Sequence, residues 1–373
     1  MTKAAELAKM GEVLTNSQIG GRRNMIINGA MQVAQRGTSS TGLGDGDEGY
    51  VAHDRWRHTV GAGAGRYTAT QTADGPSGFA NCLKIACTTA DTSIAASERF
   101  MLEQRIEGQD LQQLKKGTSD AEKITVSFYV KGHDSATYTV GLYDTDGRQV
   151  GATFSVTTSW ARQTVTFPAD TSGVLANDNS AQIHLRIFLH GGSNYTSGTF
   201  ATAWESATNA NQISSSANSI FESTSATFFI TGVQLEVGSQ ATPFEHRSFG
   251  EELQLCQRYL FKDQDGSGAA YKRYAHGGAS ATTVASISFT IPTPLRAVPT
   301  LVLSGNVNTF LAFSAGATDA LTGLIIATDD DAGTFNRAVE LTATVGSGLV
   351  AGEQVSIISN NSTSTFISLD AEL

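Results

Sequence analysis

Residues 138–156 read YTVGLYDTDGRQVGATFSV, and this stretch decides the fold class. Two runs rich in β-branched and aromatic residues flank the turn sequence 144–148, which is the pattern of a β-hairpin. Similar strand-like runs recur on both sides with turn-rich gaps and no long helix between them, at residues 124–130, 161–167, 183–189 and 226–236. This recurrence predicts an all-β sandwich over residues 23–247.

A helical pattern interrupts the strands after this region. The sequence at 248–251 is a capping box, and Leu253, Cys256 and Leu260 then recur on one face of a helix predicted over residues 249–262.

Strand-like runs resume beyond a short polar stretch at 263–269, which is typical of a linker. We therefore expect a helix and linker at 248–269, followed by a smaller C-terminal β-sandwich at 270–373.

The N-terminal segment 1–22 has a stripe of small and apolar residues at helical spacing, which includes Leu7 and Leu14. One interpretation is a short helix that packs on a partner, and the other is a frayed terminus. Short helices with narrow apolar faces are marginal alone. We therefore expect this segment and the 249–262 helix to pack against their copies in a homotrimer.

Composition excludes several classes of function. The chain has 373 residues, and only 16% of them are charged; 25 basic residues face 35 acidic ones. Binding to nucleic acid through its phosphates requires a concentration of Lys and Arg, so we expect no nucleic-acid partner. No run of about 18 apolar residues occurs, so we expect no insertion into a membrane.

The sequence contains no recognisable catalytic motif. There is no Gly-x-Ser-x-Gly elbow, no His-Glu-x-x-His, no phosphate loop and no Cys-x-x-Cys. The three cysteines also lack metal-ligand spacing. We expect a protein that is not an enzyme and has no cofactor, with structural calcium as the one exception considered. The acidic loop formed by Asp329, Asp330 and Asp331 is the candidate calcium site, and a solvated turn is the competing interpretation.

Aromatic side chains in a long polar loop are candidates for carbohydrate recognition. Tyr195 and Trp204 lie in the Ser-, Thr- and Asn-rich stretch 192–216. Flat aromatic rings can stack on the apolar faces of sugars, so these two residues are the predicted glycan contacts. The alternative is that each ring only holds its own loop in place.

Several strings resemble a known family when taken in order. Residues 22–37 (RRNMIINGAMQVAQRG) followed by 54–56 (DRW) resemble the opening of phage and prophage tail-fibre or appendage proteins. Residues 233–247 (VQLEVGSQATPFEHR) resemble the last strand of jelly rolls of the carbohydrate-binding-module type, and 251–259 (EELQLCQRY) resemble the helix that follows it. The resemblance implies a jelly-roll sandwich, a location on the virion and homotrimeric assembly.

Taken together, these features predict a structural subunit of a phage tail fibre or appendage, made in the host cytoplasm. Its N-terminal segment would attach to a tail hub, adaptor or capsid protein, and residues 270–373 would contact host-surface polysaccharide. One alternative is a capsid decoration or head-fibre protein. The other is a polysaccharide-degrading tailspike, although the sequence has no repeat of fixed period.

Overall fold

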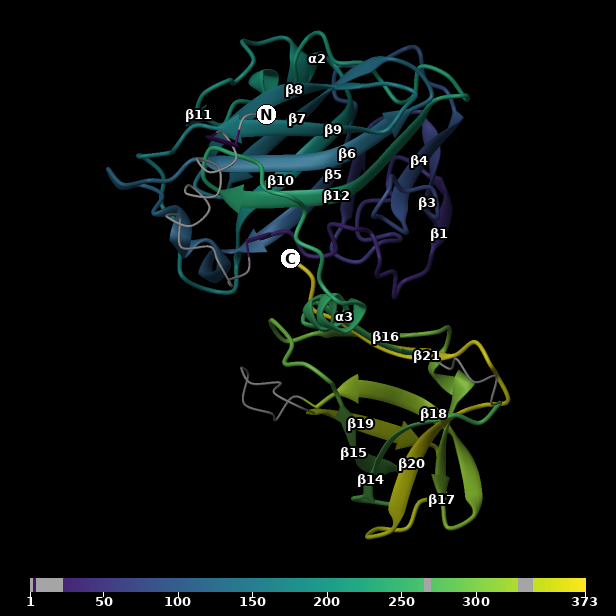
Figure 1. Cartoon of the computed structure of the whole chain (residues 1–373). Coiled ribbons are helices and arrows are strands. Elements are labelled where there is room, and N and C mark those ends of the chain that lie inside the picture. Colours follow the sequence, from purple (N-terminus) through teal and green to yellow (C-terminus); the bar gives the residue numbers. More distant parts are fainter. Residues whose placement is uncertain (1–2, 5–22, 265–269, 328–337) are drawn as a thin grey trace. The chain divides into compact units, whose positions relative to one another are not determined.

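The structure, a computed structural model, describes residues 3–4, 23–264, 270–327 and 338–373. The chain divides into two compact units, with the boundary between Glu252 and Leu253 (Figure 1). The prediction of an all-β chain with a large jelly-roll sandwich is confirmed. Leu7 and Leu14, and the helix predicted around them, lie outside the described residues.

The first unit consists of two antiparallel six-stranded sheets. Sheet A has the order β1 (Ser39–Leu43), β3 (Arg66–Thr72), β4 (Cys82–Thr89), β12 (Thr227–Val237), β6 (Ile124–Gly132) and β9 (Ala161–Phe167). Sheet B has the order β11 (Glu205–Ser206), β8 (Arg148–Val156), β7 (Ala136–Asp144), β10 (Ala181–Gly191), β5 (Arg99–Glu107) and β2 (Arg57–Gly61). The short helices η1 (Gly108–Asp110), η2 (Gln112–Leu114), α2 (Ser193–Thr196) and η3 (Asn209–Asn211) lie in the connections.

The hairpin predicted at 138–156 forms as the pair β7 and β8. Tyr143 lies opposite Gln149, and Gly141 lies opposite Gly151. The Asp144 side chain accepts a hydrogen bond from the backbone N–H of Arg148 at 3.0 Å, which closes the turn.

Strand β10 shows how the strands separate core from surface. Ile183, Leu185 and Ile187 belong to the core between the sheets, whereas His184 and Arg186 point to the opposite face. The core also contains Trp56, which is fully buried.

Asn28 ties three distant parts of the first unit together. Its backbone is left-handed, with φ of 57°, a conformation that asparagine tolerates better than most residues. The side-chain amide donates to the carbonyl oxygens of Val33 at 2.8 Å and Asp54 at 3.0 Å, and its oxygen accepts from the Val33 N–H at 2.9 Å. The Asn28 carbonyl accepts from Trp56 Nε1 at 3.2 Å, and its N–H donates to the Glu252 carboxylate at 2.5 Å.

Asn24 makes a second set of long-range bonds beside the first. Its amide donates to the Val233 carbonyl at 3.0 Å, and its oxygen accepts from the Leu235 N–H at 3.0 Å. The Glu245 carboxylate accepts the Asn24 N–H at 2.9 Å. Arg247 donates to the Ile26 carbonyl at 3.0 Å. The segment after β12 is thus fastened to the start of the unit by buried and half-buried polar groups.

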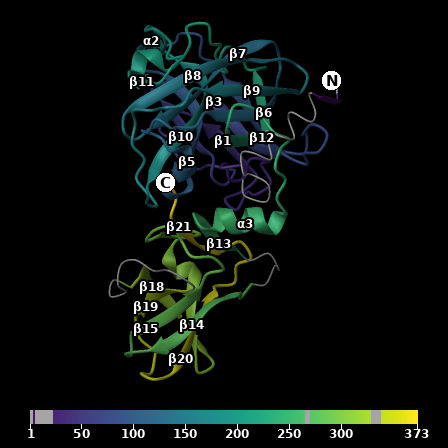
Figure 2. The ribbon, with the colours of Figure 1, turned by 60° about the vertical axis from the view of Figure 1, so that its left-hand side comes forward.

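The second unit contains a closed barrel with a small sheet. The barrel order is β14 (Arg273–Ala279), β15 (Val284–Thr290), β19 (Ala338–Val345), β18 (Ala317–Ile326), β17 (Phe310–Ser314) and β20 (Gln354–Ser359) (Figure 2). The small sheet has the order β13 (Leu260–Gln264), β21 (Phe366–Asp370) and β16 (Thr300–Leu303), and η4 (Val307–Thr309) precedes β17. Closure replaces the two open sheets that the sequence led us to expect. The alternation of buried and exposed residues is the same in a barrel and in a sandwich, so the sequence pattern does not separate them.

The connecting helix is shorter than predicted. Helix α3 covers Phe249–Gln257, and Leu260 begins strand β13, where it pairs with Asp370. The predicted helix over 249–262 is therefore wrong at its C-terminal end, because pairing with β21 decides the conformation from Leu260 onward.

The burial of two predicted assembly residues also differs from expectation. Cys256 is 0% exposed and Leu260 is 3% exposed within the single chain. Both side chains are therefore packed without a second copy, and of the predicted set on α3 only Leu253 remains half-buried.

We predict that Asn28→Ala destabilises the first unit by about 3 kcal/mol or more, because it leaves several buried backbone groups without partners and places alanine at a positive φ. All three tryptophans (Trp56, Trp160 and Trp204) lie in this unit, so urea unfolding followed by tryptophan fluorescence reports on it. Asn177→Ala, at an exposed position, is the matched control and should leave the midpoint unchanged. Equal midpoints for the two variants would contradict the role of Asn28.

Candidate functional site

The outer face of sheet B carries a pair of glycines in β7 and β8, which we call the glycine floor. Gly141 and Gly151 lie opposite each other there. A Cβ atom on Gly151 would lie 2.9 Å from the Phe200 ring, and one on Gly141 would lie 3.1 Å from the Val150 carbonyl oxygen. Glycine in a strand interior often marks the close approach of another group. At Gly151 the Phe200 ring occupies the space that a side chain would need, and at Gly141 the Val150 carbonyl restricts it.

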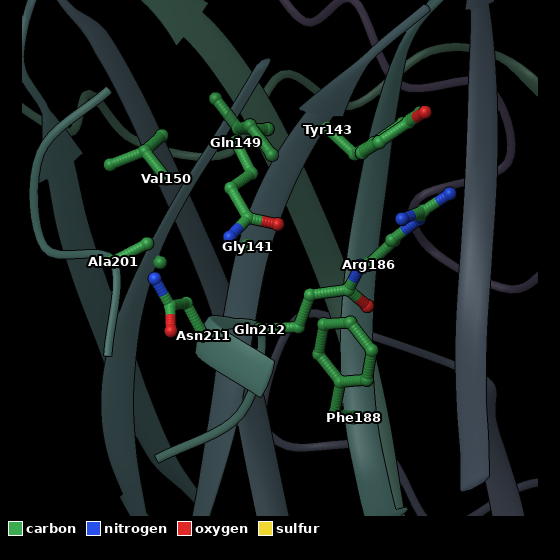
Figure 3. A pocket seen from close by; sticks show the side chains of 11 residues that line it. Gly141, Tyr143, Gln149, Val150, Arg186, Phe188, Ala201, Asn211 and Gln212 are labelled. Carbon is green, nitrogen blue, oxygen red and sulfur yellow. The ribbon is translucent and has the colours of Figure 1, made fainter. Parts of the chain in front are cut away.

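A hollow lies above this floor, and Figure 3 shows the side chains around it. Four of the residues come from the strands, namely Tyr143, Gln149, Arg186 and Phe188. Asn211 is the last residue of η3, and Gln212 follows it. The free volume is about 10 Å³, which is roughly the space of one water molecule. In this conformation the side chains of the walls leave only a small depression.

One carboxylate holds two of the three amide side chains of the walls. Glu205 accepts hydrogen bonds from Gln149 Nε2 at 3.1 Å and from Asn211 Nδ2 at 2.8 Å. The oxygen of the buried Gln149 amide has no hydrogen-bond partner among the described residues. Gln212 is held only at the surface, by a bond of 3.1 Å to Asn209. The wall thus contains an acceptor without a partner, the Gln149 oxygen, and a side chain that is held by one exposed hydrogen bond, Gln212.

A buried carboxylate, Glu103, organises the charges next to the hollow. It is fully buried, and its oxygens lie 2.7 Å from Arg186 Nε and 2.7 Å from Arg105 Nε. His184 Nδ1 lies 3.2 Å away, and Arg57 Nη1 lies 3.9 Å away. The Arg186 guanidinium also stacks on the Tyr143 ring, 4.0 Å from its centroid. Glu103 therefore fixes the position of Arg186 in the wall.

The protonation states in this cluster follow from burial and charge. Burial alone would raise the pKa of the Glu103 carboxyl, but the hydrogen bond from His184 and the charge of Arg186 outweigh it and place that pKa well below its usual range. Burial lowers the pKa of His184, although its bond to Glu103 opposes the shift. At neutral pH the cluster therefore holds an ionised carboxylate beside a neutral imidazole.

Tyr195, a predicted glycan contact, lies close to the hollow. It belongs to α2 and packs against Met101, Phe188 and Ile213 on the outer face of sheet B. Its ring centroid lies 5.5 Å from the Arg99 guanidinium. Through Phe188 it supports the floor of the hollow from one side.

Trp204, the other predicted contact, is held in a different place. Its indole N–H donates to the Pro168 carbonyl at 2.8 Å, and its ring lies 5.3 Å from the Lys116 ammonium. That ammonium is buried between the carboxylates of Asp144 and Asp170. The structure thus separates Trp204 from Tyr195 and gives it contacts that hold its loop on the sandwich.

The predicted calcium site lies outside the described residues and stays a prediction. Asp329, Asp330 and Asp331 lie outside them, and within the described part no group of three or more His, Cys, Asp or Glu side chains is arranged to hold an ion. In the same part of the chain, no helix has the length and hydropathy needed to cross a membrane.

Sequence reasoning missed the residues that surround the hollow, yet part of the signal was present. The hairpin turn at 144–148 fixes the register of β7 and β8, and this register places Gly141 opposite Gly151. The alternation of β10 also placed His184 and Arg186 on one face. The contributions of Asn211 and Gln212 carried no such signal, because a loop brings them there.

Comparisons with known proteins give a likeness of fold. No protein-family model matches the chain, and no curated protein matches its sequence. Similar solved structures include a carbohydrate-binding module of the CBM4 type, with 13% identity, 56% of this chain and 97% of that chain covered, and a TM-score of 0.30. A family 11 carbohydrate-binding module from Clostridium thermocellum has 12% identity, 55% and 99% coverage, and a TM-score of 0.28. The enzymatically active domain of tailspike protein 4 from bacteriophage CBA120 has 10% identity, 49% and 19% coverage, and a TM-score of 0.27.

We predict that Glu103→Gln destabilises the first unit by about 2 kcal/mol, since it removes the charge that compensates three arginines in a largely buried site. The cost stays below that of a fully buried pair because Arg186 and Arg105 are 13% and 25% exposed. Urea unfolding followed by tryptophan fluorescence measures the change. The control is Glu122→Gln, which removes an exposed ion pair with Lys115 and should leave the midpoint unchanged. A stable Glu103→Gln variant would contradict the assigned role.

Proposed function

We propose that this chain is a glycan-binding structural subunit of a phage particle, with the hollow on sheet B as its saccharide site. The observation that carries the proposal is a glycine floor, on which the Phe200 ring packs, beside a hollow lined by aromatic rings and neutral amides. Tyr143 and Phe188 offer apolar surface, and Gln149, Asn211 and Gln212 offer both donors and acceptors. Ligand sites commonly have this composition, with a few polar groups placed among apolar ones.

The chemistry of these groups suits hydroxyl-rich ligands. A sugar hydroxyl is both a donor and an acceptor, and an amide side chain can serve either role. The unused oxygen of Gln149 is an acceptor in a buried position, where a missing hydrogen bond is unfavourable. A hydroxyl donor that reached it would relieve this deficit.

We propose that the hollow opens by movement of the Gln212 side chain. Gln212 lies across the space in Figure 3, and its hydrogen bond to Asn209 is at the surface. Rotation of this side chain exchanges one exposed hydrogen bond for water or ligand. The sheet and its glycines need not move.

The state of Glu103 favours binding over hydrolysis. A general acid needs a pKa close to the working pH. The pKa of Glu103 is instead held below its usual range, by the His184 hydrogen bond and the Arg186 charge against the opposing effect of burial. Such a carboxylate positions neighbouring groups and is not poised to act as a general acid, and we propose that the hollow binds its ligand without hydrolysing it.

For the particle, we propose attachment through residues 1–22 to a tail hub, adaptor or capsid protein, with the chain assembled as a homotrimer. Support comes from α3, where Phe249 is 57% exposed and Leu253 is half-buried. An exposed aromatic side chain at the start of a helix is a surface that a second copy can cover. Residues 270–373 would face the host polysaccharide.

Loss of the Gln212 amide tests the saccharide site. A glycan array with the full chain should identify a bound oligosaccharide, and Gln212→Ala should weaken its binding by about tenfold, because one amide contact is lost. Gln240→Ala, at an exposed position outside the hollow, should bind as the parent does. Calorimetry with the selected oligosaccharide measures both. Array binding that Gln212→Ala leaves unchanged would remove the hollow from the proposal.

Native mass measurement tests the assembly. The expected species contains three chains of 39.2 kDa each, and Phe249→Asp should shift it toward the monomer by placing a charge on the covered surface. Val174→Asp, at another exposed apolar position, should leave the trimer intact. A monomeric parent at micromolar concentration would refute the trimer. Copy number on imaged particles then separates a tail fibre, with a few trimers, from a capsid decoration with many.

A further inference from the structure

An open groove lies on the outer face of the barrel, over β14, β17 and β20. Its volume is about 500 Å³, which is within the usual range for small-molecule sites, roughly 300 to 1,000 Å³. The residues that matter for its chemistry are Arg273, His276, Phe313, Glu353, Gln354 and Ser356. The groove belongs entirely to the second unit.

One end of the groove is built around the hydroxyl group of Ser356. This residue is only 4% exposed, and its oxygen lies 3.1 Å from Arg273 Nη1 and 3.0 Å from His276 Nδ1. The Arg273 guanidinium also stacks on the Phe313 ring, 4.7 Å from its centroid. These two contacts hold a guanidinium in a defined place at the surface.

The charge of Arg273 is not compensated within the described part of the chain. No carboxylate there forms an ion pair with it, whereas Arg186 and Arg148 are paired with Glu103 and Asp170. A guanidinium has five N–H donors, and only one hydrogen bond to protein is made here. The remaining donors have no protein partner among the described residues, and Arg273 lines the groove.

The other end of the groove presents acceptors. Glu353 accepts a hydrogen bond from the Ser314 hydroxyl at 3.1 Å, and Gln354 beside it is exposed. Glu353 precedes Ser356 by three residues along the chain, which is about 10 Å in an extended strand. A ligand that contacts both ends must therefore span about 10 Å, as a short saccharide does.

We propose that this groove is a second saccharide site, and that its ligand carries a carboxylate, as a uronic acid does. The planar fork of Arg273 matches a carboxylate with two parallel hydrogen bonds. Phe313 supplies apolar surface beside it, and Glu353 and Gln354 accept hydrogen bonds from ring hydroxyls. The site is independent of the hollow on sheet B, because it uses other residues in the other unit.

Calorimetry on the full chain tests the proposal with two probes, a galacturonic acid trimer and a neutral galactose trimer of the same linkage. The acidic trimer should bind, and more weakly as salt rises. The neutral trimer should bind at least about tenfold more weakly, since it lacks the partner of the guanidinium. Binding of neither trimer, or equal binding of both, would overturn the proposal.

Substitutions locate the binding. Arg273→Met should weaken binding of the acidic trimer by about tenfold or more, and Arg273→Lys should restore it only in part, because the charge returns without the fork. Lys115→Met removes the same charge from an exposed position in the first unit and should have no effect. Gln212→Ala should also have no effect. Loss of binding in Gln212→Ala with retention in Arg273→Met would assign the ligand to the hollow, overturning this site while leaving the proposed function in place.

Discussion

The hydrogen bonds of Asn28 are the constraint on which the first unit depends. Asn28 has a left-handed backbone, and its side-chain amide donates hydrogen bonds to the carbonyl oxygens of Val33 and Asp54. Its backbone carbonyl accepts from the Trp56 indole, and its backbone N–H donates to the Glu252 carboxylate. Buried backbone groups must be paired, so these four contacts fix where the chain enters the sandwich and where it leaves. Through these bonds the strings NMIING and DRW and the stretch 245–252 form one polar cluster, although Asn28 and Glu252 are 224 residues apart in the sequence.

The two proposed saccharide sites use residues outside these strings. On sheet B, Glu103 neutralises the arginines around it, and the hollow beside it is lined by neutral amides and rings. On the barrel, Arg273 has a ring and a hydroxyl as neighbours, and no described carboxylate pairs with it. Arg186 and Arg273 thus differ in their surroundings: Arg186 is paired with the buried carboxylate of Glu103, whereas no described carboxylate pairs with Arg273.

The sequence predicts the parts of this molecule that depend on local pattern. The hairpin at 144–148, the alternation of β10 and the start of α3 all follow from neighbouring residues. Where long-range pairing decides, the pattern is insufficient. Leu260 has the spacing of a helix but pairs with Asp370, and six alternating strands close into a barrel. The candidate site follows the same rule: the glycine floor is implied by the hairpin register, whereas Tyr195 and Trp204, neighbours in one loop, diverge because that loop turns between them.

The glycine floor and the loop part of the walls differ in how much substitution they tolerate. Any side chain at Gly151 meets the Phe200 ring, and any at Gly141 meets a strand carbonyl, so the floor admits almost no substitution. One part of the walls comes from the loop after η3, where the Gln212 side chain bonds to Asn209 at the surface, and this part can be exchanged without disturbing the sheet. Sequence change at this site is therefore expected in the loop part of the walls and not in the floor.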